Sequence, residues 1–519
     1  MKKIFHGCFI IVFALVMHGF AHQYGMEDKN WVGAMLESGR FKELREIVAA
    51  YESSDDSEKK FQSILLRAQL AFYQGDYSTA VGTLATARDS RIQDQTWKNL
   101  LSFYEMVRRN TEGFEEYESE HFIVRAQDVD RILMGYAAEC LEQTYRVLGA
   151  YFNEFPDEKI IVEIFPDKDS FSRSSTLSPE TLERSGAIGI CKFHRLMILS
   201  PRALLMGYRW LDALSHEYTH LLINHASYFN APLWLHEGIA RYFELTWRSD
   251  PEKPLDFLTS AARAQLMDAV QNNALIPIER MHPSLVYLDN QEEVSLAFSE
   301  VSSMVDFILD RYGRDSIARL LNGFRTYKQK KNFKKILNIS ESKLEKKWIS
   351  HIQSLPDAEY AGALGERYVF DTSADEIEQF IGADARGKVR LGDKFRKTGR
   401  LNVALIQYTG ALAIEPENPI ILTKTARCLD AMGKHDEMKE KLSEAIAHSP
   451  NYPTAYILLA ERLYKENQMP EARDLFIHAN AINPFNPIIH IRLKKIYEAL
   501  GDLEKSQTEN RIISILNTR

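Results

Sequence analysis

The last quarter of the chain carries the same residue types every 34 positions. Three columns show this spacing: Pro416, Pro450 and Pro484; Ala411, Ala445 and Ala479; and Gly399, Gly433, Asn467 and Gly501. Glycine or asparagine suits the tight turn inside a helix pair, alanine lets two helices approach closely, and proline ends the second helix. The period therefore predicts a stack of similar helix pairs, each in contact with its neighbours along the chain.

This spacing resembles that of the tetratricopeptide repeat. We expect a C-terminal array over residues 385–519, with three full repeats from about 385 to 486 and a partial fourth after them. The resemblance implies a surface for peptides or partner proteins. An array that only braces its neighbour remains the alternative.

A weaker form of the same pattern lies near the N-terminus. Its residues are Gly39, Phe41 and Leu44, followed by Gly75, Tyr77, Ala80, Leu84 and Ala87. We therefore predict an N-terminal helical region, similar to tetratricopeptide repeats, over residues 22–115. The glutamate-rich stretch from Thr111 to Glu120 is interpreted as a junction.

Between the two helical regions the pattern changes to short, β-branched segments. Four of them are predicted strands: residues 121–126, 159–165, 187–193 and 196–200. A helix is expected from about 129 to 154, and nearly everything from Arg202 to about Trp348 is predicted to be helical. Strands followed by helices indicate an α+β domain, placed over residues 118–355, with a linker over 356–384. The chain as a whole is expected to be predominantly helical.

The N-terminus has the composition of an export signal. Lys2 and Lys3 precede an apolar run from Ile4 to Phe20, and Gly19 and Ala21 fit a cleavage site. We expect residues 1–21 to be a signal peptide, so that the protein is periplasmic or secreted. Anchoring by an uncleaved N-terminal segment is the alternative.

Composition excludes several classes of partner. The formal net charge of −8, from 64 basic and 72 acidic side chains, does not indicate a basic surface for nucleic acid. No other apolar run approaches the length that crosses a bilayer, so no integral membrane domain beyond the signal segment is expected. After removal of Cys8, the remaining Cys140, Cys191 and Cys428 are too few for a disulfide framework.

The central domain contains a His-Glu-x-x-His sequence from His216 to His220. On a helix, residues four apart lie on one face, so both imidazoles can bind the same Zn²⁺. Glu217 then lies beside the metal, where it can take a proton from water activated by zinc. A catalytic zinc needs three protein ligands and an open position, and Glu237 on the next helix can supply the third ligand.

These residues resemble the gluzincin metallopeptidases, the thermolysin- and aminopeptidase-like branch of the peptidase MA group. The similarity rests on the His216–His220 motif and on the Trp-Leu-x-Glu-Gly-x-Ala-x-Tyr-x-Glu pattern from Trp234 to Glu244. It implies one Zn²⁺ per chain, held by His216, His220 and Glu237, with Glu217 as the general base. It also implies that Glu244 orients a ligand, although an exposed helical glutamate remains the alternative.

The resemblance further implies a strand upstream of the motif helix against which an extended substrate pairs its backbone. Its residues would be Ala187, Ile188 and Gly189. Ala187 and Gly189 are small enough to let another chain approach closely. Histidines outside the motif, such as His236, are interpreted as packed or surface side chains. On a helix, the side chain of His236 points about 100° away from that of Glu237.

Two departures from the family pattern affect the predicted activity. Nothing like the Gly-x-Met-Glu-Asn stretch of the aminopeptidases precedes His216, which favours an endopeptidase. The family often places an oxyanion-stabilising tyrosine on a later helix, where this chain has Phe298, which cannot donate a hydrogen bond. Tyr287, Tyr242 or another histidine is left as a possible substitute.

The sequence thus predicts a zinc-dependent peptidase whose helical repeats recruit protein substrates or partners. The alternative is a non-catalytic envelope scaffold, in which zinc stabilises a degenerate peptidase core and the repeats bind proteins. Phe298 favours the scaffold, whereas an intact Glu217 favours the enzyme. Inhibition by the linker over 356–384, folded across the cleft, is a third possibility.

Overall fold

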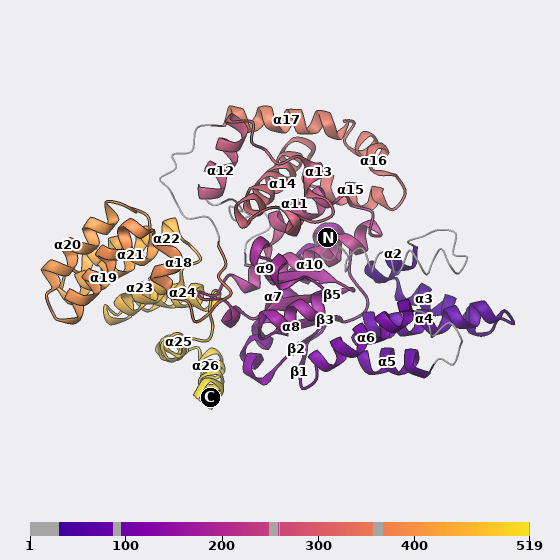
Figure 1. Ribbon diagram of the computed structural model, residues 1–519, viewed down its shortest axis with the longest axis horizontal. Helices are drawn as coiled ribbons and strands as arrows, with labels where there is room; N and C mark the ends of the chain where they lie inside the picture. The colour runs from indigo at the N-terminus through magenta and orange to yellow at the C-terminus, as the bar shows by residue number, and fades with distance from the viewer. Residues whose placement is uncertain (1–30, 87–94, 249–257, 259, 356–366, 518–519) are drawn as a thin grey trace, which may run out of the picture.

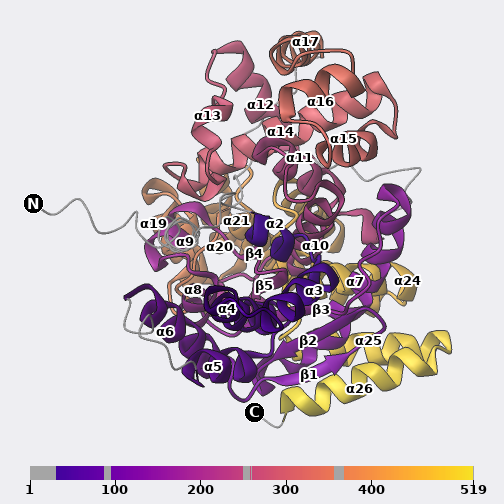
Figure 2. The ribbon, with the colours of Figure 1, turned by 90° about the vertical axis from the view of Figure 1, so that its right-hand side faces the viewer.

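The computed structural model describes residues 31–86, 95–248, 258, 260–355 and 367–517. It has a central α+β region, with one helical region on either side of it (Figures 1 and 2). The predicted fold class, an α+β domain flanked by helical regions in a predominantly helical chain, is confirmed. No helix in these ranges is long and apolar enough to cross a membrane.

Some predictions fall outside the described residues. They are the signal peptide over residues 1–21, Ala87, and residues 356–366 of the predicted linker.

In the described part of the N-terminal region there are five helices: α2 (Trp31–Glu37), α3 (Phe41–Glu52), α4 (Ser57–Tyr73), α5 (Tyr77–Thr86) and α6 (Gln95–Asn110). Short turns connect the first four of these helices. Asp56 caps α4 by accepting a hydrogen bond from the backbone of Glu58, which satisfies one of the free N–H groups of the first turn. The helical hairpins expected from the weak repeat pattern are therefore present.

The central sheet has five strands: β1 (Glu115–Glu118), β2 (Phe122–Ala126), β3 (Ile160–Phe165), β4 (Gly189–Lys192) and β5 (Arg195–Leu199). Their order is β1-β2-β3-β5-β4. The pairs β2–β3 and β3–β5 are parallel, and the two outer pairs are antiparallel. The stretch predicted as a junction thus contains β1, whose four exposed residues hide the alternation by which a strand is recognised.

The two faces of the sheet belong to different hydrophobic cores. Along β5, Leu196 and Ile198 pack with the central helices, whereas Met197 and Leu199 pack with the N-terminal helices. Side chains of a strand alternate between the faces, so both faces of a central strand must be covered. The N-terminal helices are therefore one layer of the central fold.

The helices of the central region, with its single turns of 3₁₀ helix, follow in this order: η2 (Asp128–Asp130), α7 (Arg131–Phe152), α8 (Lys168–Ser175), α9 (Pro179–Ser185), η3 (Pro201–Ala203), α10 (Trp210–Ser227), α11 (Leu233–Phe243), η4 (Thr246–Arg248), α12 (Ser260–Gln271), α13 (Ile278–Met281), η5 (Leu285–Tyr287), α14 (Gln291–Tyr312), α15 (Ser316–Phe324), α16 (Gln329–Ile336) and α17 (Glu341–Ser354). Helix α10 lies against β4 and β5, and α11 packs on α14. Figure 1 shows α11 to α17 stacked above the sheet.

The C-terminal region begins with a short helix and continues as four helix pairs: α18 (Glu376–Phe380), α19 (Ala383–Lys397) with α20 (Leu401–Leu412), α21 (Pro419–Ala431) with α22 (His435–His448), α23 (Pro453–Lys465) with α24 (Met469–Asn480), and α25 (Pro487–Leu500) with α26 (Leu503–Asn517). The stack predicted from the 34-residue period is present, and the expected partial fourth repeat also forms a helix pair. The array has hydrophobic clusters of its own.

The array touches the central region at several places; for example, the backbone N–H of Tyr208 donates to the carbonyl of Ile482 at 3.1 Å. The Arg209 side chain, at the start of α10, donates hydrogen bonds to the Asn451 side chain at 2.9 Å and to the Pro450 carbonyl at 3.0 Å. At the far end of the array, Ile512 of α26 is buried in the central hydrophobic core. The array is therefore attached to the central region from its middle to its C-terminal end.

Candidate metal centre

Helices α10 and α11 bring two histidines and one glutamate to a common point. His216 and His220 lie one turn apart on α10, and Glu237 faces them from α11, after the turn at residues 228–232. An oxygen of Glu237 lies 3.8 Å from Nε2 of His216 and 3.3 Å from Nε2 of His220. One ligand atom from each of the three residues falls within 4.8 Å of the others, so the three side chains can hold a metal ion.

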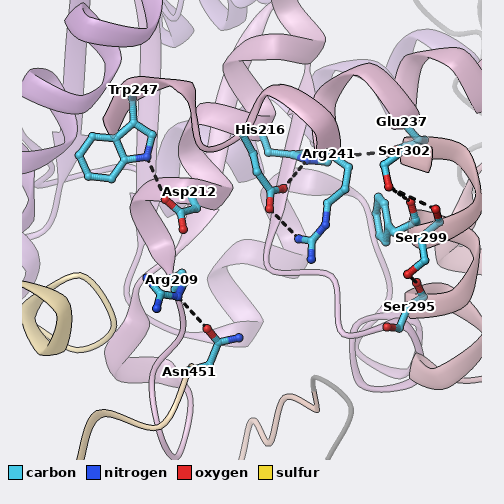
Figure 3. A network of polar contacts seen from close by, with 12 residues as sticks. Arg209, Asp212, His216, Glu237, Arg241, Trp247, Ser295, Ser299, Ser302 and Asn451 are labelled. Atoms are coloured by element: carbon cyan, nitrogen blue, oxygen red, sulfur yellow. Dashed lines mark hydrogen bonds and ion pairs between the residues drawn. The ribbon is translucent and has the colours of Figure 1, made fainter. Parts of the chain in front are cut away.

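Glu244 lies behind His216, at the end of α11. Its carboxylate is 3.2 Å from Nδ1 of His216 and forms an ion pair with Arg241 at 2.8 Å. Figure 3 shows His216 between Glu237 on one side and the Arg241 pair on the other. An imidazole that donates from Nδ1 to a carboxylate presents its Nε2 lone pair to the opposite side, which is the orientation a metal ligand needs.

The charges of these groups depend strongly on one another. Burial lowers the pKa of His216, but its hydrogen bonds with Glu237 and Glu244 outweigh burial and raise the pKa to about 10. Burial raises the pKa of Glu237, yet the neighbouring charge of His220 and hydrogen bonds from both imidazoles bring it far below its usual range. Without a cation between them, the three side chains thus share protons as an ion-paired cluster.

His220 is oriented by a second imidazole. Nδ1 of His220 lies 2.6 Å from Nδ1 of His236, and the two rings stack with centroids 4.6 Å apart. Nε2 of His236 in turn contacts the side-chain oxygen of Asn224 at 2.8 Å. Asn224 accepts from His236, His236 accepts from His220, and Nε2 of His220 is left free to bind a metal.

The sequence interpretation of His236 as a packed side chain overlooked this contact. A helical wheel compares the side-chain directions of His236 and Glu237 on one helix, α11. The partner of His236 is His220, which lies on the facing helix α10. The only available signal was a further histidine beside a predicted ligand, which does not reveal an inter-helix contact.

Glu217 faces the edge of the sheet. It is 8 % exposed, and burial raises the pKa of its carboxyl group. The backbone N–H of Cys191 in β4 donates a hydrogen bond to this carboxylate. A Cβ atom on Gly189 would lie 2.7 Å from Oε1 of Glu217, so the strand passes this close only because residue 189 is a glycine.

The predicted substrate strand lies at this edge, displaced by two residues. Strand β4 begins at Gly189, while Ala187 and Ile188 precede it and line the same cleft. The carbonyl of Ile188 accepts a hydrogen bond from Leu199, which extends the pairing with β5. Strand β4 is the last strand of the sheet, and no strand among the described residues pairs with its outer side.

The metal-binding cluster opens into a large cleft of about 2530 Å³. One wall comes from the central region, including His216, Glu217 and Glu237. The opposite wall comes from the array, at the turns that precede α19, α21 and α23. The cleft is therefore built jointly by the central region and the C-terminal repeats.

The position expected to hold an oxyanion donor is apolar. Phe298 of α14 meets the ring of His216 edge-on, with centroids 5.8 Å apart. Neither Tyr242 nor Tyr287 is among the described residues that line the cleft. Tyr368, which lies within the stretch predicted as a linker, does line the cleft, together with Ser299 of α14. The two tyrosines proposed from the sequence are therefore away from the cleft.

Comparison with known proteins relates the central region to one superfamily. The sequence profile of the Peptidase MA superfamily matches residues 183–354, which contain the predicted metal ligands.

Two curated proteins are similar to shorter stretches of the chain. DnaJ homolog subfamily C member 3 of Mus musculus is 29% identical over 22% of this chain and 23% of its own length. RNA polymerase II-associated protein 3 of Rattus norvegicus is 26% identical over 23% of this chain and 18% of its own length. The chain thus spans a quarter or less of the length of these relatives.

The similar solved structures include a tetratricopeptide-repeat domain. The first tetratricopeptide-repeat domain of Spaghetti (RPAP3), bound to the HSP90 peptide SRMEEVD, has a TM-score of 0.22 and 22% identity, covering 24% of this chain and 98% of that one. MamA has a TM-score of 0.23 and 24% identity, covering 24% of this chain and 73% of that one.

Proposed function

We propose that the chain is a zinc-dependent peptidase of the gluzincin type. The observation that carries this proposal is the convergence of His216, His220 and Glu237 at the floor of a cleft, with Glu217 beside them. Two imidazoles, each oriented by a contact at its Nδ1, and one carboxylate form a donor set that fits Zn²⁺ better than the all-oxygen donor sets preferred by Mg²⁺ or Ca²⁺. We propose one zinc ion per chain.

A zinc ion held there would polarise a peptide carbonyl and make water more acidic. In this chain, Glu217 takes the proton from the attacking water and passes it to the leaving amine. Its burial favours proton uptake, because a carboxylate with a raised pKa is a stronger base. Glu244 and His236 keep the two imidazoles in the tautomers that leave both Nε2 atoms free.

The shape of the cleft favours a polypeptide substrate. Its volume of about 2530 Å³ exceeds the roughly 300–1,000 Å³ typical of pockets for small molecules. The free edge of β4 passes over Glu217, where an extended chain can pair with it by β-augmentation. A chain that enters along this edge passes the site without ending there, as expected of an endopeptidase.

The array and the N-terminus complete the proposal. The repeats bind protein substrates or partners, and one side of the array already forms a wall of the cleft. The charged and apolar pattern of residues 1–21 supports export to the periplasm or the exterior.

The decisive test compares the wild type with Glu217→Gln. We expect one zinc per chain in both proteins, measured by elemental analysis. We expect hydrolysis of an unfolded protein by the wild type only, with a loss of about 10²–10⁴-fold in the variant, since general-base catalysis typically contributes that much. Glu46→Gln, on the exposed face of α3, is the matched control and should retain full activity. Zinc-free wild type would contradict the ligand assignment.

A non-catalytic scaffold stabilised by zinc is the second candidate function. The observation that favours it is Phe298, which places an apolar ring against His216 where a hydroxyl donor is expected. Stoichiometric zinc in both proteins, with no metal-dependent cleavage by either, would support the scaffold. Phe298→Tyr sharpens this test, because a hydroxyl there should create or increase hydrolysis only if the rest of the site is competent.

A further inference from the structure

We propose that Glu37, in the N-terminal helical region, is a positioning residue for the substrate-binding strand β4. The inference rests on the proposed peptidase function and extends it to a residue outside the metal-binding cluster. It gives the N-terminal helices a role in substrate binding that does not require them to contact the substrate.

Glu37 holds the turn that connects β4 to β5. Its Oε1 accepts a hydrogen bond from the backbone N–H of Phe193 at 3.3 Å, and its Oε2 accepts one from His194 at 3.4 Å. Both turn residues have left-handed backbone angles, with φ of 58° and 53°. A two-residue turn of this kind is strained for bulky side chains, so the surrounding structure must hold it in place.

The side chains of the turn are locked into the N-terminal helices. Nδ1 of His194 contacts the backbone carbonyl of Glu37 at 3.2 Å, and its ring meets Phe41 edge-on. A Cβ atom on Gly39 would lie 2.8 Å from Nε2 of His194, so the chain between α2 and α3 can close over the ring only with glycine. Phe193 enters the aromatic cluster around Phe72.

Only a short stretch separates this anchor from the cleft. Strand β4 has four residues, so the turn follows two positions after Cys191, whose N–H contacts Glu217. Lys192, the last residue of the strand, donates a hydrogen bond to Thr176 at 2.5 Å. A strand this short, fixed at its turn, transmits any displacement of the turn to the segment that passes over Glu217.

The choice of a carboxylate at residue 37 supports positioning rather than filling of space. A buried carboxylate is costly to desolvate, and burial raises the pKa of Glu37. An apolar side chain would avoid that cost, but it could not accept from two adjacent N–H groups. The Tyr73 hydroxyl donates to the same carboxylate at 2.9 Å and completes its hydrogen bonding.

The experiment compares Glu37→Gln with Tyr73→Phe in the full chain. The amide retains one acceptor oxygen and turns its NH₂ towards one of the two backbone donors. Tyr73→Phe removes a partner of the same carboxylate but leaves both backbone contacts intact. For an unfolded protein substrate, we expect Glu37→Gln to lower kcat/KM about tenfold, mainly through KM, because small displacements of a binding element have effects of this order or larger.

Two further readouts separate positioning from loss of folding. Zinc content should be unchanged, and hydrogen exchange of residues 189–194 should be faster in Glu37→Gln than in Tyr73→Phe. Glu37→Asp keeps the negative charge but has a shorter side chain, so it should also raise KM. This variant replaces Glu37→Gln in the comparison if Glu37→Gln does not fold. Equal KM in the two main variants would overturn the inference alone, whereas a wild type without hydrolysis would overturn the proposed function and this inference with it.

Discussion

The two helical regions that flank the centre are joined to it in different ways. The N-terminal helices share one continuous hydrophobic core with a face of the sheet, including Met197 and Leu199 of β5. The C-terminal array keeps hydrophobic clusters of its own and meets the centre through separate contacts, among them the Arg209 hydrogen bonds, the Tyr208–Ile482 backbone hydrogen bond and Ile512. Figure 1 shows the two regions on opposite sides of the central region.

This difference shows that similar helical hairpins can serve two purposes in one chain. A helix pair packed on a sheet becomes a layer of the domain and cannot be lost without exposing apolar strand residues. A repeat stacked mainly on other repeats remains a nearly separate unit whose stability depends on its neighbours. We therefore expect perturbations at the N-terminal interface to unfold the centre, and those at the C-terminal interface to stay local.

The largest effect is expected at Arg195, in the N-terminal interface. This fully buried side chain lies 3.4 Å from Glu163, donates to the Phe72 carbonyl at 3.2 Å and lies over the Phe72 ring. Arg195→Leu leaves the Glu163 carboxylate buried without its cation, which should cost about 3–5 kcal/mol of unfolding free energy. Chemical denaturation followed by tryptophan fluorescence measures this loss.

The matched control is an ion pair inside the array. Lys424 contacts Asp393 at 2.8 Å, and both side chains are about one fifth exposed, at 19% and 20%. Lys424→Met should cost about 1 kcal/mol or less, because partly solvated pairs contribute little. Equal losses at the two sites would contradict the distinction between an integral layer and an attached module.

Acid should weaken the N-terminal interface through His194. Burial lowers the pKa of this imidazole to about 4, with the neighbouring His225 adding to the shift and the Glu37 carbonyl opposing it. In the unfolded chain the imidazole takes up a proton near pH 6.5, but in the folded chain only near pH 4. Stability is therefore lost as the pH falls between these values, by up to about 3 kcal/mol.

Thermal unfolding between pH 7 and pH 4 tests this dependence. His194→Gln, which cannot be protonated, should flatten the pH dependence in that window, whatever its effect on stability at pH 7. An unchanged slope in the variant would show that other groups carry the acid sensitivity.

Local patterns predicted the elements well but not the way they assemble. The 34-residue columns depend on turns and close helix contacts within each pair, such as those at Gly399 and Ala411, and these recur at every repeat. The ligand spacing from His216 to Glu237 is likewise carried by two neighbouring helices. In contrast, nothing in the pattern around Gly75 or Tyr77 indicates that these helices cover a sheet whose strand β3 lies more than 80 residues further along the chain.

The details missed at the site have the same origin. The contact of His236 with His220 and that of Glu37 with the β4–β5 turn both join residues on separate elements. A periodic pattern shows which face of a helix is buried, but it does not show what that face meets. Strand β1 was missed for a different reason, because all of its residues are exposed and charged or aromatic.

A smaller effect is expected where the end of the array meets the centre. Ile512→Ala removes a side chain that is 6% exposed and lies in the central core, at an expected cost of about 2 kcal/mol, the lower end for such truncations. Hydrogen exchange should increase in α25 and α26 while the central strands stay protected. Ile489→Ala, within the array's own core, is the control and should loosen the array without changing exchange in α7.

The smallest effect is expected at Arg209, which contacts the middle of the array. Arg209→Ala removes its contacts with Asn451 and Pro450, which Figure 3 shows in part, at a cost of about 1 kcal/mol. Unfolding of the centre should stay within error of the wild type, because none of these bonds lies in the shared core. Exchange should rise in residues 448–453, and since this turn lines the cleft, KM for an unfolded protein should rise slightly. Asn451→Ser, which removes one of the bonds, should give a smaller change in the same direction. If Arg209→Ala unfolds the centre as Arg195→Leu does, the array is an integral layer as well, and the contrast between the two regions fails.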